Sequence, residues 1–154
     1  MAKEIERKFL VKNLFFKELG VPHKIKQGYI CTEKNRVVRV RLYDEQAFLT
    51  LKSASVGFSR EEFEYEIPLK DAEIMLQTLC IQPVIEKTRW VIPQGKRKWE
   101  IDVFEGENLG LIIAEIELEN EAETFKIPEF IDKEVTGDVR YYNSFINQNP
   151  YSKW

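Results

Sequence analysis

Charged and apolar residues alternate along most of the segments with strand-like composition. In the clearest case, residues 36–43, Val38, Val40 and Leu42 fall on one face and Arg39 and Arg41 on the other, because successive side chains of a strand point to opposite faces. The same alternation recurs along the chain and predicts about eight strands joined by turns. We place them at residues 3–11, 24–32, 36–43, 47–53, 59–67, 81–92, 98–104 and 111–118.

Helical patterns are few and short. They cover residues 13–20, 71–79 and about 138–147, and the last has Tyr141, Tyr142, Phe145 and Ile146 on its apolar face,. Residues 119–134 have a mixed pattern that indicates a short helix near 121–125 and an extended piece near 130–135. At 154 residues the chain is expected to form one domain, residues 1–154,.

The charges on the strands are sorted by sign, which bears on how the sheet is arranged. An open sheet with a solvated face normally mixes both signs, because like charges opposite one another are destabilising. Sorting is better explained if the charged faces line an enclosed space. We therefore predict a mainly β (α+β) fold, a closed antiparallel eight-stranded β-barrel tunnel with a charged lumen and a few flanking helices. The cations are Lys8, Arg39, Arg41, Lys52, Lys87 and Arg89, and the acids are Glu4, Glu6, Glu62, Glu64, Asp102, Glu115 and Glu117.

The first of these strands indicates what such a lumen would hold. Glu4, Glu6 and Lys8 share one face of residues 3–11. Two carboxylates at i and i+2 can hold a hard divalent cation, and a neighbouring lysine can hold an anion such as phosphate. Taken alone, this strand is better explained as a half-buried strand with a charged solvent face. With the sorted charges elsewhere, a metal-bound polyphosphate is the ligand that balances both signs.

Composition excludes several other functions. The net charge of −3 argues against a general nucleic-acid binder,. Cys31 and Cys80 match no metal-ligand spacing, and His23 is the only histidine, so a Ser-His-Asp or histidine-rich zinc site is not expected and His23 is assigned to a turn or the surface. The charged start and the lack of a long apolar run predict a cytoplasmic protein with reduced cysteines and no membrane segment.

The ordered series of motifs resembles the CYTH superfamily, the triphosphate tunnel metalloenzymes. Glu-x-Glu-x-Lys at residues 4–8 is similar to the family's signature on its first strand. The further motifs follow in the family's order over nearly the whole chain. They are Gln27-Gly28-Tyr29, Arg39-Val40-Arg41, Leu51-Lys52, Arg60-x-Glu62-x-Glu64, Lys87-Thr88-Arg89, Asp102-x-Phe104-x-Gly106, Gly110-Leu111, Ala114-Glu115-x-Glu117, and Val135-Thr136-Gly137-Asp138 with Tyr141.

The resemblance implies a role for each charged residue. Mg²⁺ or Mn²⁺ would be held by Glu4, Glu6 and one late-strand carboxylate, Glu115 or Glu117. The triphosphate would lie along Lys8, Arg39, Arg41, Lys52, Lys87 and Arg89, with Lys87 also counted among the catalytic residues. Glu62, Glu64 and Asp102 would place a second metal or orient the attacking water, and Glu62 or Glu64 is favoured as the proton acceptor.

The expected function is metal-dependent hydrolysis of a triphosphate, with inorganic tripolyphosphate as the favoured substrate. A class IV-type adenylate cyclase and a thiamine triphosphatase are the rival enzymes, and a polyphosphate- or nucleotide-binding module without turnover is the rival of a different class. The partner expected is a small triphosphate molecule, with no duplex nucleic acid and no membrane. The chain is expected to be a monomer or a homodimer.

Overall fold

The computed structural model describes residues 5–54, 56 and 60–154. The strands are β1 (Ile5–Val11), β2 (Val21–Glu33), β3 (Arg36–Tyr43), β4 (Gln46–Ser53), β5 (Glu62–Ile67), β6 (Ile85–Gln94), β7 (Arg97–Phe104), β8 (Ile112–Leu118) and β9 (Ile131–Glu134). The α-helices are α1 (Phe16–Leu19), α2 (Leu69–Thr78) and α3 (Asn143–Gln148). Short 3₁₀ turns are η1 (Gly106–Asn108), η2 (Val139–Tyr141) and η3 (Tyr151–Lys153). None of the helices in these ranges has the length and apolar character needed to cross a bilayer.

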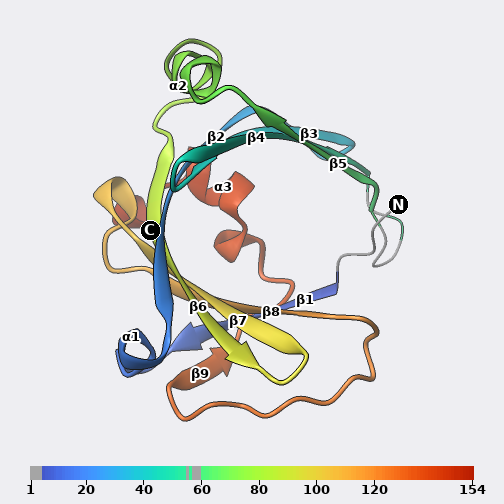
Figure 1. Cartoon of the computed structure of the whole chain (residues 1–154), viewed down its shortest axis with the longest axis vertical. Helices are drawn as coiled ribbons and strands as arrows, with labels where there is room; N and C mark the ends of the chain where they lie inside the picture. Colours follow the sequence, from blue (N-terminus) through green and yellow to red (C-terminus); the bar gives the residue numbers. More distant parts are fainter. Residues whose placement is uncertain (1–4, 55, 57–59) are drawn as a thin grey trace.

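All the strands belong to one antiparallel sheet with the order β5-β4-β3-β2-β6-β7-β8-β1-β9. The sheet is strongly curved, and its two ends turn toward each other without meeting (Figure 1). The mainly β fold is therefore confirmed. Closure is not, because the sheet has nine strands rather than eight and, within the described residues, β5 does not pair with β1 or β9.

The extra strand gives a physical reason for the open edge. β9 pairs with the C-terminal half of β1, at Phe9 and Val11. The backbone nitrogen of Val135 then donates to the Lys8 carbonyl at 2.8 Å. The outer edge of β1 from Lys8 onward is thus already hydrogen-bonded, and β5 cannot use it.

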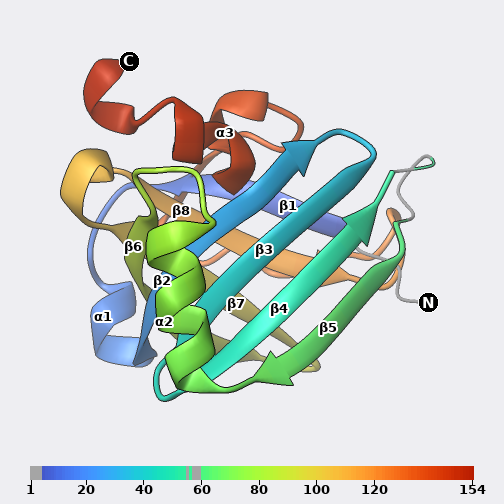
Figure 2. The ribbon, with the colours of Figure 1, turned by 90° about the horizontal axis from the view of Figure 1, so that it is seen from above.

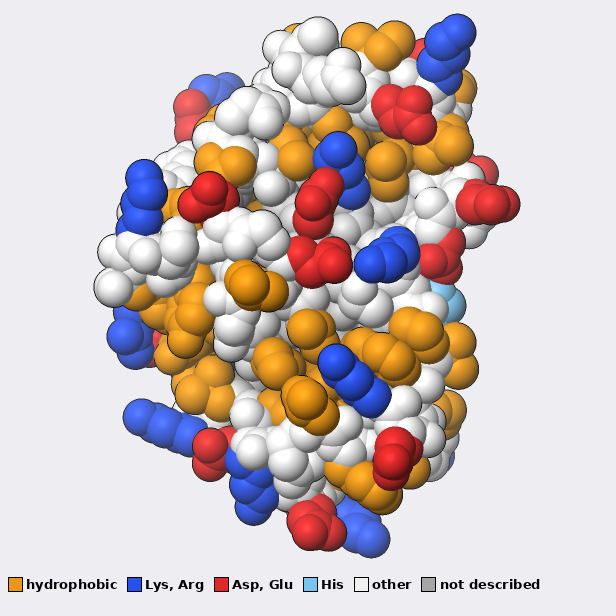
Figure 3. All heavy atoms as spheres, turned by 90° about the vertical axis from the view of Figure 1, so that its left-hand side faces the viewer, with side chains coloured by type: hydrophobic (Ala, Val, Ile, Leu, Met, Phe, Trp, Pro, Cys, Tyr) orange, Lys and Arg blue, Asp and Glu red, His pale blue; other side chains and the backbone are white. Residues whose placement is uncertain are grey.

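The two faces of the sheet differ in chemistry. Outside the curl, α2 covers an apolar cluster that includes Val40, Ala47 and Leu76, and α1 and β9 help to cover a second cluster around Trp99 and Phe130. Figure 2 shows α2 lying across the strands on this outer side. On the outer surface drawn in Figure 3, side chains of both signs are interspersed among apolar ones. On the side drawn there, the charges are thus not sorted by sign.

The C-terminal segment closes one end of the concave face. Figure 1 shows α3 inside the curl of the sheet. Ile146 is completely buried and Tyr141 is 9% exposed, in a cluster with Tyr29 and Phe104 of the concave face. Ile146 and Tyr141 both lie on the apolar face expected for residues 138–147, whereas Tyr142, expected on the same face, is exposed. The predicted helix over 138–147 is divided into η2 and α3.

Candidate active site

The strand register brings the predicted charged residues onto one surface. In an antiparallel pair, residues directly opposite each other point to the same side of the sheet. Lys8 lies opposite Glu115 and Arg89 opposite Asp102. Lys52 lies opposite Glu62. The register of the remaining strand pairs puts all the described residues of the predicted site on the concave face. They are Glu6, Lys8, Arg39, Arg41, Lys52, Glu62, Glu64, Lys87, Arg89, Asp102, Glu115 and Glu117. Glu4 lies outside the described residues.

Asp102 is the centre of the most buried charge cluster. Its carboxylate accepts two hydrogen bonds from Arg89, at 2.8 and 3.0 Å, and its Oδ2 lies 2.7 Å from the Lys87 Nζ. Burial alone would raise the pKa of Asp102, but the two cations lower it to about 2,. A carboxylate held in this way is a poor proton acceptor at neutral pH. Asp102 is therefore better suited to fixing the two cations than to activating water.

Lys87 makes a weaker ion pair with Asp102 than Arg89 does. Its side chain is fully buried. Burial lowers the pKa of Lys87 to about 7, aided by the positive charges of Arg89 and Arg41 and despite the attraction of Asp102,. Arg89 makes the bidentate contact to Asp102, so this carboxylate is already largely neutralised when Lys87 reaches it,. Lys87 can therefore exchange its proton near neutral pH.

Lys8 and Glu115 form a separate buried pair on β1 and β8. The Lys8 Nζ donates to Glu115 Oε1 at 2.9 Å, and both side chains are about nine-tenths buried. Burial would lower the pKa of Lys8, but the carboxylates of Glu115 and Glu6 raise it above its usual range. Burial likewise opposes ionisation of Glu115, yet Lys8 holds the pKa of that carboxyl well below its usual value. Both groups are charged at neutral pH.

Arg41 is held by a neutral amide. Its Nε donates to Gln27 Oε1 at 2.8 Å. Gln27 Nε2 donates in turn to Asn143 Oδ1 at 3.1 Å, and the same oxygen accepts from the Lys87 Nζ at 3.0 Å. Burial, followed by repulsion from Arg39 and Arg89, lowers the pKa of Arg41 to about 9, so the guanidinium stays charged at neutral pH.

Arg39 also lacks a full set of partners. Its NH2 contacts Thr50 Oγ1 at 3.4 Å and lies 3.7 Å from Glu64 Oε2, while Thr50 donates to Glu64 at 2.9 Å. Arg39 is 9% exposed, and its buried Nε has no hydrogen-bond partner among the described residues. Leaving a buried donor unsatisfied is costly, so this N–H fits an anion that completes the site. Lys52 and Glu62, farther along the same strands, are 4.0 Å apart.

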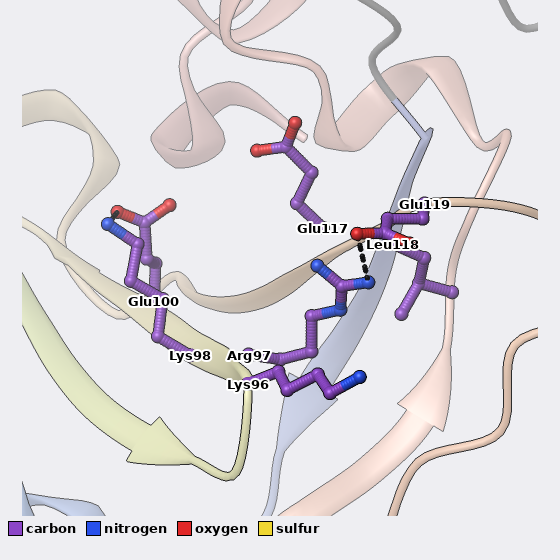
Figure 4. A pocket seen from close by; sticks show the side chains of 7 residues that line it. All are labelled: Lys96, Arg97, Lys98, Glu100, Glu117, Leu118 and Glu119. Atoms are coloured by element: carbon purple, nitrogen blue, oxygen red, sulfur yellow. Dashed lines mark ion pairs between the residues drawn. The ribbon is translucent and has the colours of Figure 1, made fainter.

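The acidic residues gather on β1 and β8, beside an open cavity of about 520 Å³. Glu6 lies directly opposite Glu117. In Figure 4 the carboxylates of Glu117 and Glu100 extend to the same side of the sheet, and Lys98 contacts Glu100 at 3.8 Å. Glu100 also accepts a 3.3 Å hydrogen bond from Arg89. The acidic end of the concave face is thus formed by Glu6, Glu115 and Glu117, whereas the charged concave side chains of β3 are cations; the cavity beside this end is lined by both signs. The cavity is lined by Lys96, Arg97, Lys98, Glu100, Glu117, Leu118 and Glu119.

The donor chemistry of this acidic end suits a hard cation. Glu6, Glu115 and Glu117 supply only carboxylate oxygens, the ligand type that Mg²⁺ and Mn²⁺ prefer. Among the described residues, however, no three acidic, histidine or cysteine side chains are close enough together to hold a metal ion. The proposed ligand Glu4 lies outside those residues.

The sequence analysis assigned no role to several site residues. Gln27 occupies a concave position of β2 and is completely buried, and its polar side chain on a buried strand position was the available signal. Thr50 and Glu100 also lie in the alternating pattern, but they carry no motif. Asn143 had no usable signal, because its place in the site depends on how α3 docks.

The comparisons with known proteins agree with this architecture. The CYTH domain model matches residues 2–142. The chain belongs to the CYTH family. This confirms the resemblance drawn from the ordered motifs.

Two curated relatives of this CYTH protein carry the same name. An inorganic triphosphatase of Acetivibrio thermocellus is 48% identical over 154 residues, covering 100% of this chain and 99% of the relative. An inorganic triphosphatase of Nitrosomonas europaea is 39% identical over 149 residues, covering 93% and 95% of the two chains. The similarity therefore extends over essentially whole proteins.

Solved structures share the fold of the CYTH chain. The crystal structure of an inorganic triphosphatase superposes with a TM-score of 0.68 at 32% identity, covering 96% of this chain and 95% of that one. A protein of Pyrococcus horikoshii, at 20% identity, has a TM-score of 0.57 and covers 77% and 79% of the two chains. At that identity the second likeness concerns the fold alone.

Proposed function

We propose that this CYTH protein is a metal-dependent triphosphatase that hydrolyses inorganic tripolyphosphate to pyrophosphate and orthophosphate. The main observation behind the proposal is that the two arginines of β3 have few partners that compensate their charge. Arg39 and Arg41 place two largely buried guanidiniums side by side on the concave face, with only a 3.7 Å contact to Glu64 and the amide of Gln27 as partners for their charge in the described residues. Repulsion between them favours a bound polyanion. The names of the two curated relatives support the same substrate.

The binding roles follow from the distribution of charge. Lys8, Arg39, Arg41, Lys52, Lys87 and Arg89 bind the phosphate oxygens and stabilise the charge that develops on them in the transition state. Glu6, Glu115 and Glu117, together with Glu4, hold Mg²⁺ or Mn²⁺. When bound, the cation neutralises phosphate charge and lowers the pKa of a coordinated water. The whole chain, residues 1–154, acts as one unit in this proposal.

Proton transfer is assigned to the β5 glutamates. Asp102 is occupied by Arg89 and Lys87, which makes it unsuitable as a base. Glu64 is partly exposed and accepts one hydrogen bond from Thr50, so it retains free acceptor capacity,. Glu62 or Glu64 orients the attacking water and takes its proton, while Lys87 stabilises the transferred phosphoryl group.

One incubation series tests the substrate. The protein is mixed with tripolyphosphate, ATP or thiamine triphosphate, each with Mg²⁺ or Mn²⁺, and orthophosphate, pyrophosphate and cyclic AMP are measured. We expect rapid phosphate release from tripolyphosphate and none after chelation of the metal. Cyclic AMP with pyrophosphate from ATP would overturn the assignment in favour of a cyclase. Binding of tripolyphosphate without turnover would leave only a binding module.

A substitution on β1 tests the metal assignment. Glu6→Ala removes a carboxylate opposite Glu117 and should lower metal-dependent turnover by more than about 100-fold, since even outer partners of metal ligands contribute 10- to 100-fold. The control is Glu86→Ala, an exposed glutamate paired with Lys26 on the outer face, which should leave turnover unchanged. Equal activity of the two variants at low metal concentration would defeat the assignment.

A further inference from the structure

A chain of two amides joins two of the phosphate-binding cations. Arg41 donates to Gln27 Oε1, Gln27 Nε2 donates to Asn143 Oδ1, and Lys87 donates to that same oxygen. Guanidinium and ammonium groups can only donate hydrogen bonds. The cations at the two ends therefore fix the orientation of both amides, with each carbonyl oxygen turned toward a cation.

The use of amides is electrostatically distinct from the pairs elsewhere in the site. Lys8 and Arg89 are paired with the carboxylates of Glu115 and Asp102, which cancel charge. An amide oxygen satisfies a buried donor without adding a negative charge. Gln27 thus holds Arg41 in place while leaving its positive charge available to a polyanion, whereas Lys87 meets both the Asn143 oxygen and the Asp102 carboxylate, at 3.0 and 2.7 Å.

The position of Asn143 is set by the packing of α3 and not by its own hydrogen bonds alone. Ile146 and Asn147, one turn later, are completely or almost completely buried. Asn147 Nδ2 donates to the Pro83 carbonyl at 2.8 Å. On the other side, the Lys8 Nζ lies 5.4 Å from the centre of the Tyr142 ring. The start of α3 is therefore held between the β1 side and the β2–β6 side of the concave face.

We propose that Asn143 is a positioning residue of the triphosphate site. Through one amide oxygen it fixes the Lys87 ammonium and keeps Gln27 turned so that its carbonyl supports Arg41. The C-terminal segment thereby forms part of the active site, although it carries none of the residues assigned to metal or phosphate binding. This inference rests on the proposed function and deepens it.

Two substitutions at residue 143 separate positioning from charge. Asn143→Ala removes the shared acceptor and lets Lys87 and Gln27 move, which should lower kcat/KM for tripolyphosphate by about 10- to 100-fold, mainly through kcat. Asn143→Asp keeps an acceptor oxygen but places a carboxylate beside the anion site. It should raise KM by about tenfold or more, with a smaller effect on kcat.

The control is Asn147→Ala, which removes a hydrogen bond that anchors α3 away from the cations. It should lower Tm but change kcat and KM by less than about twofold at 25 °C. If the variants at 143 and 147 lose activity in proportion to Tm alone, Asn143 only anchors the helix and the inference is wrong. Should Asn143→Ala fail to fold by circular dichroism, Asn143→Asp with the same control decides the question.

A binding measurement distinguishes failure of this inference from failure of the proposed function. Calorimetric titration with metal-free tripolyphosphate should show a weaker Kd for Asn143→Asp than for the wild type and Asn147→Ala. Equal affinities would overturn the role of Asn143 while leaving the triphosphatase assignment intact. A wild-type protein that neither binds nor hydrolyses tripolyphosphate would overturn both.

Discussion

The β1–β8 side and the β2–β3 side of the concave face hold their cations in opposite ways. On β1–β8, Lys8 meets the carboxylate of Glu115 and its pKa is raised. On β2–β3, Arg41 meets the amide of Gln27 and its pKa is lowered to about 9, chiefly by burial and then by neighbouring arginines. Similar burial therefore gives opposite shifts, and the partner decides the sign.

This contrast explains how one surface can take up a ligand of mixed charge. The β1–β8 side carries the acids Glu6 and Glu117 in addition to Glu115. The β2–β3 side has cations with too few acids. In the proposed function, a metal-bound polyphosphate would span the two sides with its cation toward the first and its anion toward the second. The comparison leads to three predictions.

The largest effect is expected when each cation is replaced by methionine. Lys8→Met leaves Glu115 buried without its partner and should reduce the free energy of unfolding by about 3 kcal/mol. Arg41→Met removes a poorly compensated charge and should cost less than about 1 kcal/mol. Urea unfolding without ligand measures both. Equal losses would mean that the two sides do not differ in charge compensation.

A smaller effect is expected from the proton on Lys87. Its pKa is about 7, and a bound polyanion favours the ammonium. Below pH 7 the proton is already present; above it, binding must take one up, so affinity falls as pH rises. Between pH 6.5 and 8.5 the Kd for metal-free tripolyphosphate should weaken by about tenfold. The charged groups that act on the Lys87 ammonium are Arg41, Arg89, Asp102 and Glu115.

Lys87→Met is the matched control for this pH dependence. It cannot take up the proton, yet it experiences the same ionisation of tripolyphosphate itself. Subtracting its pH profile isolates the contribution of Lys87. If the difference between the two profiles is flat, Lys87 does not change protonation on binding.

The smallest effect is expected for His23, which belongs to neither set of partners. The sequence placed it in a turn or at the surface; it lies within β2, is partly exposed, and its Nδ1 is 2.6 Å from Asp44 Oδ2. Exposed pairs contribute about 1 kcal/mol or less. His23→Gln should change stability by no more than that and leave kcat within about twofold. A large loss of turnover would bring His23 into the mechanism.

The sequence predicted the faces of the sheet better than its edges. Alternation places Arg39 and Arg41 opposite Val38 and Val40 regardless of which strands are neighbours, and the register agrees with it. Closure depends on which strand reaches the free edge of β1, and the weakly patterned segment near 130–135 supplies that strand as β9. Which of two strands pairs with a given edge depends on tertiary structure, so local sequence patterns do not predict it.

The short helix expected near 121–125 is wrong for a similar reason. Residues 121 and 122 form a turn, in which Asn120 Oδ1 accepts from the Ala122 nitrogen. Glu123 accepts two 2.7 Å hydrogen bonds from Arg97. This distant arginine holds the segment against the β6–β7 hairpin in a conformation that local preferences do not predict.

The site shows the same division. Its charges were predictable because they follow strand alternation, and their roles as metal and phosphate ligands stay predictions. The roles of the neutral groups were not predicted: Gln27 was part of a motif but was given no role, and Asn143 enters from a separate helix.

The pairing of β1 with strands late in the sequence also determines when the site can assemble. The Lys8–Glu115 contact closes a loop of 107 residues, and the contact from Lys8 to Thr136 spans 128. The β2–β3–β4–β5 hairpins need only neighbouring residues. Long loops cost more entropy to close. The hairpins of β2 to β5 can therefore form during synthesis, whereas β1, which is synthesised first, can pair only after β8 has been made. The growing chain can thus display Arg39 and Arg41 before it acquires the carboxylates of Asp102 and Glu115 on β7 and β8.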